Sequence, residues 1–198
     1  MNPQTIIFIG RSGCGKSTQA KLLAEYIEKA DTQHRQIYHV ETGAEFREFI
    51  KGKNLTNVLS RKVYENVERQ PDFLAVTMWT KAFIENLTGE EHVMIDGAPR
   101  SLPEAYVLDG ALNFYGRKAN IVYLNVSREW SEKMLMSRGR EDDSSAEKIK
   151  KRLDWFDKDV IPAIEYFKQG GFHTVVEVKG ERPPEEVLAD IVTGLQTK

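Results

Sequence analysis

The chain has 198 residues, a length typical of one domain, and 40% of its residues are apolar while 29% are charged. Its net charge of −2 does not favour a nucleic-acid partner, and no apolar stretch reaches the ~20 residues that a membrane span needs. The single cysteine, Cys14, excludes an intramolecular disulfide and a Cys-x-x-Cys zinc site. We therefore expect a cytoplasmic protein with no zinc, no nucleic-acid partner and no membrane partner.

Five short apolar runs alternate with longer amphipathic stretches along the chain. Continuous apolar strands separated by helices are typical of a parallel sheet that is covered on both faces. We therefore predict an α/β fold with a five-stranded parallel sheet flanked by helices. The runs lie at residues 6–9, 37–40, 93–95, 121–124 and 175–178.

The first run leads directly into a phosphate-binding sequence. Residues 10–17 match the pattern G-x-x-x-x-G-K-[ST], and a helical stretch from 17 to 30 follows. Glycines let backbone N–H groups turn inward around phosphate oxygens, and the helix N-terminus adds its positive dipole end. We expect Lys16 to reach the β- and γ-phosphates of a nucleotide and Ser17 to bind Mg²⁺. The expected nucleotide contacts are Gly10, Ser12, Gly13, Cys14, Gly15, Lys16, Ser17 and Thr18.

A long segment separates the second strand from the third. It holds the 52 residues between Val40 and Val93 and is mainly helical in pattern, which is too long for a simple crossover. We predict an inserted helical subdomain at about residues 44–70. The third strand then ends in Asp96, and the carboxyl ends of adjacent parallel strands meet at one sheet edge. Asp96 is therefore expected to complete the Mg²⁺ site beside Ser17.

Near the C-terminal end, apolar residues at helical spacing predict one long helix from Ser144 to Gln169. Ser144 and Glu147 form a capping-box pattern at its start. Pro162 is expected to kink this helix, and the glycines at 170–171 are expected to end it.

Taken in order, the short motifs resemble those of the adenylate kinase family. Residues 96–100, Asp-Gly-Ala-Pro-Arg, are similar to the family's Asp-Gly-Phe-Pro-Arg, and Thr42-Gly43 resembles its Ser-Thr-Gly segment. Residues 138–143 resemble the lid stem Gly-Arg-x-Asp-Asp, and Arg152 falls at the later helix arginine. The matches run in family order from residue 6 to about residue 190, so their combination is specific although each motif is short.

The resemblance implies the P-loop nucleoside monophosphate kinase fold as a single domain over residues 1–198. Within it, a CORE would comprise residues 1–43, 71–137 and 144–198. The helical insert at about 44–70 would bind the nucleoside monophosphate, and a minimal lid would lie at about 138–143.

The resemblance also implies a mechanism in which the attacking oxygen belongs to the acceptor monophosphate, so alignment and charge neutralisation suffice. Arg47 and Arg100 would clamp the acceptor phosphate, and Arg138, Arg140 and Arg152 would neutralise the transferring group, with Lys16. The implied acceptor contacts are Thr42, Gly43, Arg47, Gly97, Arg100, Glu104, Arg140 and Arg152. Gly180 would pack against the adenine of ATP.

Three features depart from the family pattern. Only Gly139 separates Arg138 from Arg140, which predicts a lid reduced to a tight turn and a slower or leakier turnover. Ala98 replaces a bulky residue, which leaves the shape of the acceptor pocket open. Glu104 replaces the Gln that reads adenine, and an ionised carboxylate only accepts hydrogen bonds. A carboxylate suits guanine, or the N4 amine of cytosine, so AMP is the leading acceptor while the choice of base stays open.

Other classes of P-loop protein lack part of this motif set or carry motifs that this sequence does not. Kinases of other small molecules, such as shikimate or gluconate, share the P-loop but not the ordered motifs, and a GTPase would carry Asn-Lys-x-Asp, which the sequence lacks. We expect a monomeric ATP-dependent phosphotransferase that moves the γ-phosphoryl group of Mg-ATP to AMP and yields two ADP. The alternatives are a kinase for GMP, CMP or UMP and a catalytically weak nucleotide-binding regulator.

Overall fold

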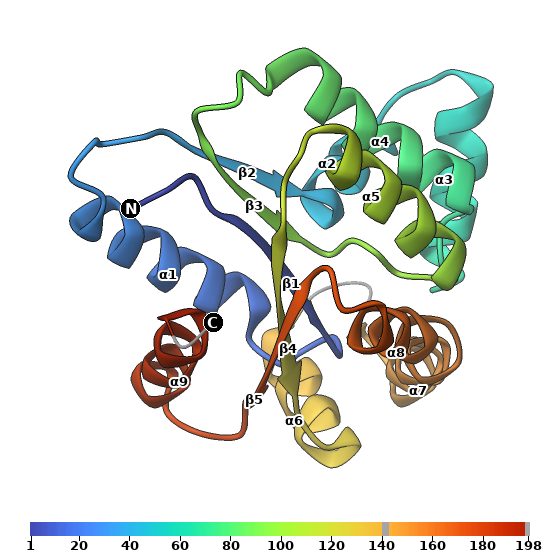
Figure 1. Cartoon of the computed structure of the whole chain (residues 1–198). Coiled ribbons are helices and arrows are strands. Elements are labelled where there is room, and N and C mark those ends of the chain that lie inside the picture. Colours follow the sequence, from blue (N-terminus) through green and yellow to red (C-terminus); the bar gives the residue numbers. More distant parts are fainter. Residues whose placement is uncertain (140–142, 197–198) are drawn as a thin grey trace.

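In the computed structural model, which describes residues 1–139 and 143–196, five strands form one parallel sheet (Figure 1). Their order across the sheet is β2-β3-β1-β4-β5. Each predicted apolar run lies in one strand, so the predicted fold class is confirmed. The strands are β1 (Thr5–Gly10), β2 (Ile37–Glu41), β3 (His92–Asp96), β4 (Ala119–Asn125) and β5 (Thr174–Lys179).

Helices cover both faces of the sheet (Figure 1). On one face lie α1 (Lys16–Ala30) and α9 (Pro184–Gln196), which pack over Ile6 and Phe8 of β1. On the other face lie α4 (Asp72–Asn86), α5 (Leu102–Phe114) and α8 (Ile161–Gly170), which pack over Ile7 and Ile9. Because both faces of β1 are buried, its side chains are apolar in succession instead of alternating with polar ones.

Two further helices, α2 (Thr42–Phe49) and α3 (Leu55–Glu65), lie between the edge strand β2 and α4. The side chains of Asn54 and Asn57 form a reciprocal capping box at the start of α3. The segment between β2 and β3 is thus helical, as expected. Its assignment to a separate acceptor-binding subdomain at residues 44–70 stays a prediction.

The prediction of one helix from Ser144 to Gln169 is wrong in two respects. The structure has α7 (Ala146–Trp155), a π-helical segment η2 (Phe156–Val160) and then α8, so the interruption comes before Pro162 and not at it. Pro162 has no N–H for the carbonyl four residues earlier, and the Ile161 N–H bonds five residues back to Phe156. The N-cap is Ser145, whose hydroxyl accepts from the Lys148 N–H, and not Ser144.

The preceding helix, α6 (Arg128–Arg138), ends at Gly139, which has a left-handed φ of 65°.

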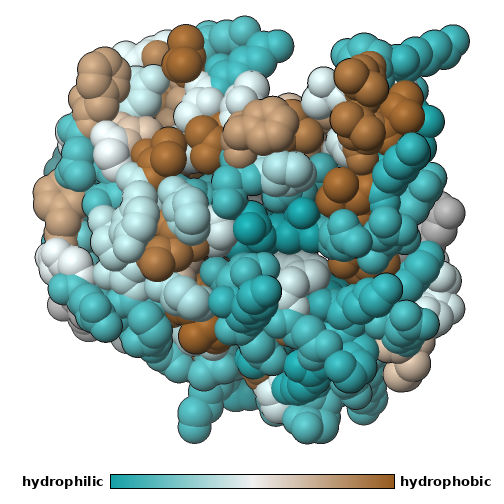
Figure 2. All heavy atoms as spheres, turned by 90° about the vertical axis from the view of Figure 1, so that its right-hand side faces the viewer, coloured by the Kyte–Doolittle hydropathy of each residue, from teal (hydrophilic) through white to brown (hydrophobic). Residues whose placement is uncertain are grey.

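Figure 2 views the side on which α3, α7 and α8 lie, and its surface is mainly hydrophilic with several small groups of hydrophobic side chains. Among residues 1–139 and 143–196, no helix has the length and apolar character needed to cross a membrane.

Candidate active site

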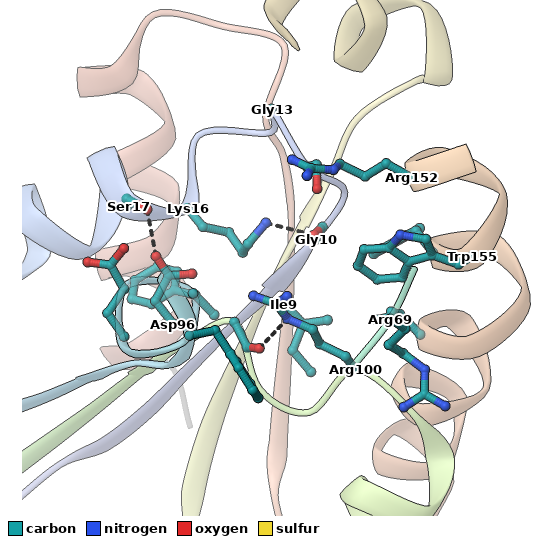
Figure 3. A pocket seen from close by; sticks show the side chains of 18 of the residues that line it. Ile9, Gly10, Gly13, Lys16, Ser17, Arg69, Asp96, Arg100, Arg152 and Trp155 are labelled. Carbon is teal, nitrogen blue, oxygen red and sulfur yellow. Dashed lines mark hydrogen bonds between the residues drawn. The ribbon is translucent and has the colours of Figure 1, made fainter. Parts of the chain in front are cut away.

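A cavity of about 520 Å³ lies at the carboxyl ends of β1 and β3, where the loop after β1 meets the end of α3, the end of α6 and the π segment (Figure 3). Six cationic side chains line it in a protein whose net charge is −2. The positive charge is therefore local, as binding of several phosphates requires. These side chains are Lys16, Arg47, Arg69, Arg100, Arg138 and Arg152.

The phosphate-binding loop has the backbone that its glycines permit. Gly13 and Gly15 have φ values of 84° and 93°, and Gly15 forms the N-cap of α1. The Lys16 ammonium donates to the carbonyl oxygens of Gly10 at 2.7 Å and Arg11 at 3.0 Å, so it rests on its own loop (Figure 3). The predicted loop residues Ser12, Ser17 and Thr18 also line the cavity. An anion placed in this cavity would meet Lys16 and the loop together.

Two of the predicted nucleotide contacts lie outside the cavity lining. The Cys14 side chain is buried in the core with the α1 and α9 face, and its Sγ accepts from the Lys16 ammonium at 3.6 Å. Gly180 packs against that loop from the other side, because a Cβ atom there would lie 3.4 Å from the Cys14 carbonyl oxygen. Its role at the adenine of ATP stays a prediction.

Ser17 and Asp96 form the oxygen pair expected for Mg²⁺. The Ser17 hydroxyl donates to Asp96 Oδ2 at 2.7 Å, and Asp96 is buried at the floor of the cavity (Figure 3). Mg²⁺ prefers few protein oxygen ligands and completes its shell with phosphate and water, which this pair fits. Within the described part of the chain, no group of three or more His, Cys, Asp or Glu side chains is placed to hold a metal ion.

The predicted acceptor arginines converge beside Gly43. A Cβ atom on Gly43 would lie 3.3 Å from Arg47 Nη1 and 3.4 Å from Arg100 Nη2. Arg100 Nε donates to the Gly97 carbonyl oxygen at 2.6 Å, and the Thr42 hydroxyl donates to that same oxygen at 2.8 Å. Burial lowers the pKa of Arg100, and an anionic phosphate would offset the desolvation that causes this shift.

Glu104 is buried beside this group and holds two donors. Its Oε2 accepts from the Arg100 backbone N–H at 2.6 Å, and its Oε1 accepts from the Trp79 indole N–H at 3.1 Å. Burial raises the pKa of Glu104. A smaller cavity next to the first is lined by Glu104 with Thr42, Gly97 and Arg100. The structure thus brings Glu104 to the acceptor residues that the motifs predict.

The residue before Pro99, Ala98, lies away from the cavity lining. Ala98 is buried in the core with residues of α4 and α5, and it lines neither the cavity at the phosphate-binding loop nor the smaller one beside Glu104. Its small size therefore bears on core packing beside the site, and its effect on an acceptor pocket stays a prediction.

Asp143 joins two of the arginines expected over the transferring phosphoryl group. Its carboxylate accepts from Arg138 Nε at 2.9 Å and forms an ion pair with Arg152 Nη1 at 3.0 Å, and its side chain is fully buried. The Arg152 side chain points across the cavity towards Gly13 (Figure 3). The prediction for Arg140 falls on residues 140–142, which lie outside the described residues.

Sequence reasoning missed one side of the cavity. Arg69 and Trp155 lie opposite Ser17 and Asp96 in Figure 3. Arg69 lines both cavities. The available signal was the position of Arg69 at the end of the predicted insert, where that segment returns to the sheet. The residues on this side are Tyr64, Val67, Glu68, Arg69, Gln70, Trp155, Phe156 and Val160.

The sequence of this chain is similar to the sequences of known proteins. A sequence model of the family described as adenylate kinase matches residues 8–172. Adenylate kinase 1 of Nostoc sp. (strain PCC 7120) is 28% identical over 187 residues, which cover 94% of this chain and 95% of that protein. An adenylate kinase of Parabacteroides distasonis is 29% identical over 94% of each chain, and one of Porphyromonas gingivalis is 30% identical over 86% of each chain.

The parallel sheet, the phosphate-binding loop and the cationic cavity define a P-loop kinase of the nucleoside monophosphate kinase fold. The family match covers most of the chain, including the loop, the Asp96 motif and the arginines after α6. The chain belongs to the adenylate kinase family and is an ATP-dependent phosphotransferase.

Proposed function

We propose that the protein transfers the γ-phosphoryl group of Mg-ATP to AMP and yields two molecules of ADP. The observation that carries this proposal is the meeting of Lys16, Arg100 and Arg152 at one cavity beside the phosphate-binding loop. Such a set of cations suits two phosphate-bearing substrates whose charges must be brought together. The names of the similar proteins support AMP as the acceptor.

The proposed reaction is an in-line transfer between two phosphate groups. An oxygen of the acceptor phosphate forms a bond to the γ-phosphorus, and the bond from that phosphorus to the β,γ-bridging oxygen breaks. ADP leaves as an oxyanion, so no side chain has to remove a proton from an already ionised acceptor. The protein contributes alignment and positive charge.

The predicted catalytic and metal-binding side chains other than Arg140, which lies outside the described residues, have these roles in the scheme. Arg47 and Arg100 would hold the acceptor phosphate, and Lys16 would leave its loop carbonyls to contact the β- and γ-phosphates. Arg138 and Arg152, fixed through Asp143, would offset charge on the transferring group. Ser17 and Asp96 would hold Mg²⁺, which when bound offsets phosphate charge in this class of reaction.

Several finer expectations belong to the same proposal. The helical segment at 44–70 would close over the acceptor, and the short stretch at 138–143 would serve as the lid. We also expect a monomer that works in the cytoplasm. The monomer expectation is tested by light scattering of the purified protein, and a stable dimer would contradict it.

Glu104 favours a second acceptor, GMP. The Trp79 indole N–H and the Arg100 backbone N–H each donate to one carboxylate oxygen of Glu104. An ionised Glu104 has no hydrogen to donate, so it offers a base only its remaining lone pairs. The guanine edge presents two adjacent donors, whereas adenine presents its N6 amine beside the N1 lone pair. An ionised Glu104 would therefore fit guanine, and a protonated one would fit adenine as a glutamine does.

The test is diphosphate formation from Mg-ATP with AMP, GMP, CMP, UMP and dTMP in separate reactions. Fastest turnover with AMP supports the leading proposal, and fastest turnover with GMP supports the second. A Lys16→Ala variant controls for contaminating kinases. Absence of turnover with all five acceptors, in a protein that binds ATP, would contradict both.

A further inference from the structure

The π-helical segment η2 lies beside the cavity and presents two acidic side chains. Phe156 and Val160 are buried and line the cavity, while Asp157 and Asp159 retain exposed fractions of 39% and 25%. A π turn inside a helix costs regular hydrogen bonding and occurs frequently at functional sites. Each of the two aspartates contacts an arginine from a different part of the site.

Asp157 holds the phosphate-binding loop through Arg11. Its Oδ1 accepts from Arg11 Nη2 at 2.5 Å, and Arg11 Nη1 donates to the Val126 carbonyl at 3.1 Å. The guanidinium also lies over the Phe156 ring, 4.9 Å from its centroid. The Arg11 carbonyl oxygen is one of the two that accept from Lys16 Nζ. Asp157 therefore fixes the backbone on which the Lys16 ammonium rests.

Asp159 holds the acceptor side through Arg69. Asp159 Oδ2 lies 3.4 Å from Arg69 Nε, and Arg69 also pairs with Asp72 at the start of α4. Arg69 lies between α3 and α4 and lines both cavities, including the one that contains Glu104. The same five-residue segment thus contacts the loop on one side and the end of the insert on the other.

We propose that the π segment is a positioning element of the active site, with Asp157 placing the phosphate-binding loop for ATP and Asp159 placing Arg69 for the acceptor. This inference rests on the proposed function, because it takes the two sides of the cavity as donor and acceptor sites. Neither aspartate contacts a substrate in this scheme; each acts through its arginine. Loss of either contact loosens one arginine, because Arg11 keeps the Val126 carbonyl and Arg69 keeps Asp72, and it leaves the other arginine in place.

The test measures two dissociation constants by calorimetry, for Mg-ATP and for the monophosphate that the wild-type protein turns over fastest. Asp157→Asn is expected to weaken Mg-ATP binding about threefold to tenfold and to leave acceptor binding within about twofold. Asp159→Asn is expected to do the reverse. A purely structural role would lower the melting temperature and change both constants together.

Asp154→Asn is the matched control. Asp154 pairs with Arg128, as Asp157 does, but it has no contact with Arg11 among the interactions of the described residues. It should leave both dissociation constants within about twofold of the wild-type values. Unchanged constants in Asp157→Asn and Asp159→Asn, or equal changes in both constants, would overturn the inference.

The two proposals fail in distinguishable ways. Absence of turnover by the wild-type protein with every monophosphate would overturn the proposed function. The Mg-ATP arm with Asp157→Asn would then still decide the role of Asp157, because it needs no acceptor. Normal wild-type turnover with unselective variants would overturn only the positioning role.

Discussion

At the scale of single residues, the candidate site depends on a few close contacts. Gly97 lies between the Thr42 hydroxyl and the Arg100 guanidinium, and its φ is 90°. Glu104 is buried against Trp79, and Asp143 is buried between Arg138 and Arg152. Each of these residues places another side chain, so each can be tested by a change that leaves the arginines and Lys16 intact.

Gly97→Ala is expected to raise the KM for the acceptor about tenfold. The new Cβ atom would lie 2.8 Å from Arg100 Nη2 and 2.9 Å from Thr42 Oγ1, so the guanidinium must move. The matched control is Gly89→Ala, because Gly89 also has a positive φ, 102°, and a methyl group there would meet nothing within 4 Å among the described residues. Both variants should lose about 1 kcal/mol of stability from backbone strain, and only Gly97→Ala should change KM.

Glu104→Gln is expected to remove a pH dependence of AMP use. Burial raises the pKa of Glu104, so lowering the pH from about 8 to about 6 increases the protonated fraction, which can donate to adenine N1. The ratio of kcat/KM for AMP between wild type and Glu104→Gln should therefore rise as pH falls. Because the acceptor phosphate titrates identically in both assays, a constant ratio would contradict this role of the carboxyl proton.

Asp143→Asn is expected to lower kcat at least about tenfold, because Arg138 and Arg152 lose their common anion. Removal of one partner from a buried ion pair also costs about 3 kcal/mol of unfolding free energy. Steady-state kinetics and urea denaturation measure the two effects. Asp190→Asn, which breaks an exposed pair with Arg182, should change neither by a measurable amount.

At the scale of elements, the helices α7 and α8 differ most from the pattern in the sequence. The apolar spacing in residues 149–167 continues through the π segment, so periodicity alone predicts one helix. The π turn is marked by the Ile161 N–H, which bonds to the Phe156 carbonyl, while Pro162 has no N–H to donate. Phe156 and Val160 of this turn are buried, and their tertiary packing is not visible in the sequence pattern. Two adjacent serines likewise compete for one cap.

Ser145→Ala is expected to destabilise the protein by about 1 kcal/mol, because its hydroxyl accepts from the Lys148 N–H at the start of α7. Ser144→Ala is the matched control, and its effect should stay within about 0.5 kcal/mol. Urea denaturation of the two variants measures both. A larger loss of unfolding free energy in Ser144→Ala would indicate that Ser144 is the N-cap, as the sequence alone suggested.

At the scale of the whole molecule, the sheet and the phosphate-binding loop could be predicted because their signals are local. Five apolar runs and one glycine-rich motif determine them without knowledge of distant contacts. The side of the cavity formed by Arg69 and Trp155 could not be predicted, because it exists only where the end of α3 meets α7 and the π segment. Glu104 was found by the spacing from Arg100, but its contact with Trp79, 25 residues earlier, needed the fold.

The short stretch of sequence that we expect to serve as the lid leads to a prediction for the molecule as a whole. Only residues 139–142 lie between Arg138 at the end of α6 and the buried Asp143, so exclusion of water depends on closure of the rest of the protein. We expect measurable release of inorganic phosphate from Mg-ATP when no acceptor is present, at a small fraction of the transfer rate. Strictly acceptor-dependent turnover of ATP would contradict this expectation.

The transfer of label from γ-³²P-ATP is the most direct test of the central claim. The protein is incubated with Mg²⁺, labelled ATP and unlabelled AMP, and the products are separated by chromatography, with Lys16→Ala as the control. We predict that the label appears in ADP, at a rate that Lys16→Ala lowers at least about a hundredfold. Label that stays in ATP, or that appears only as inorganic phosphate, would contradict transfer to AMP.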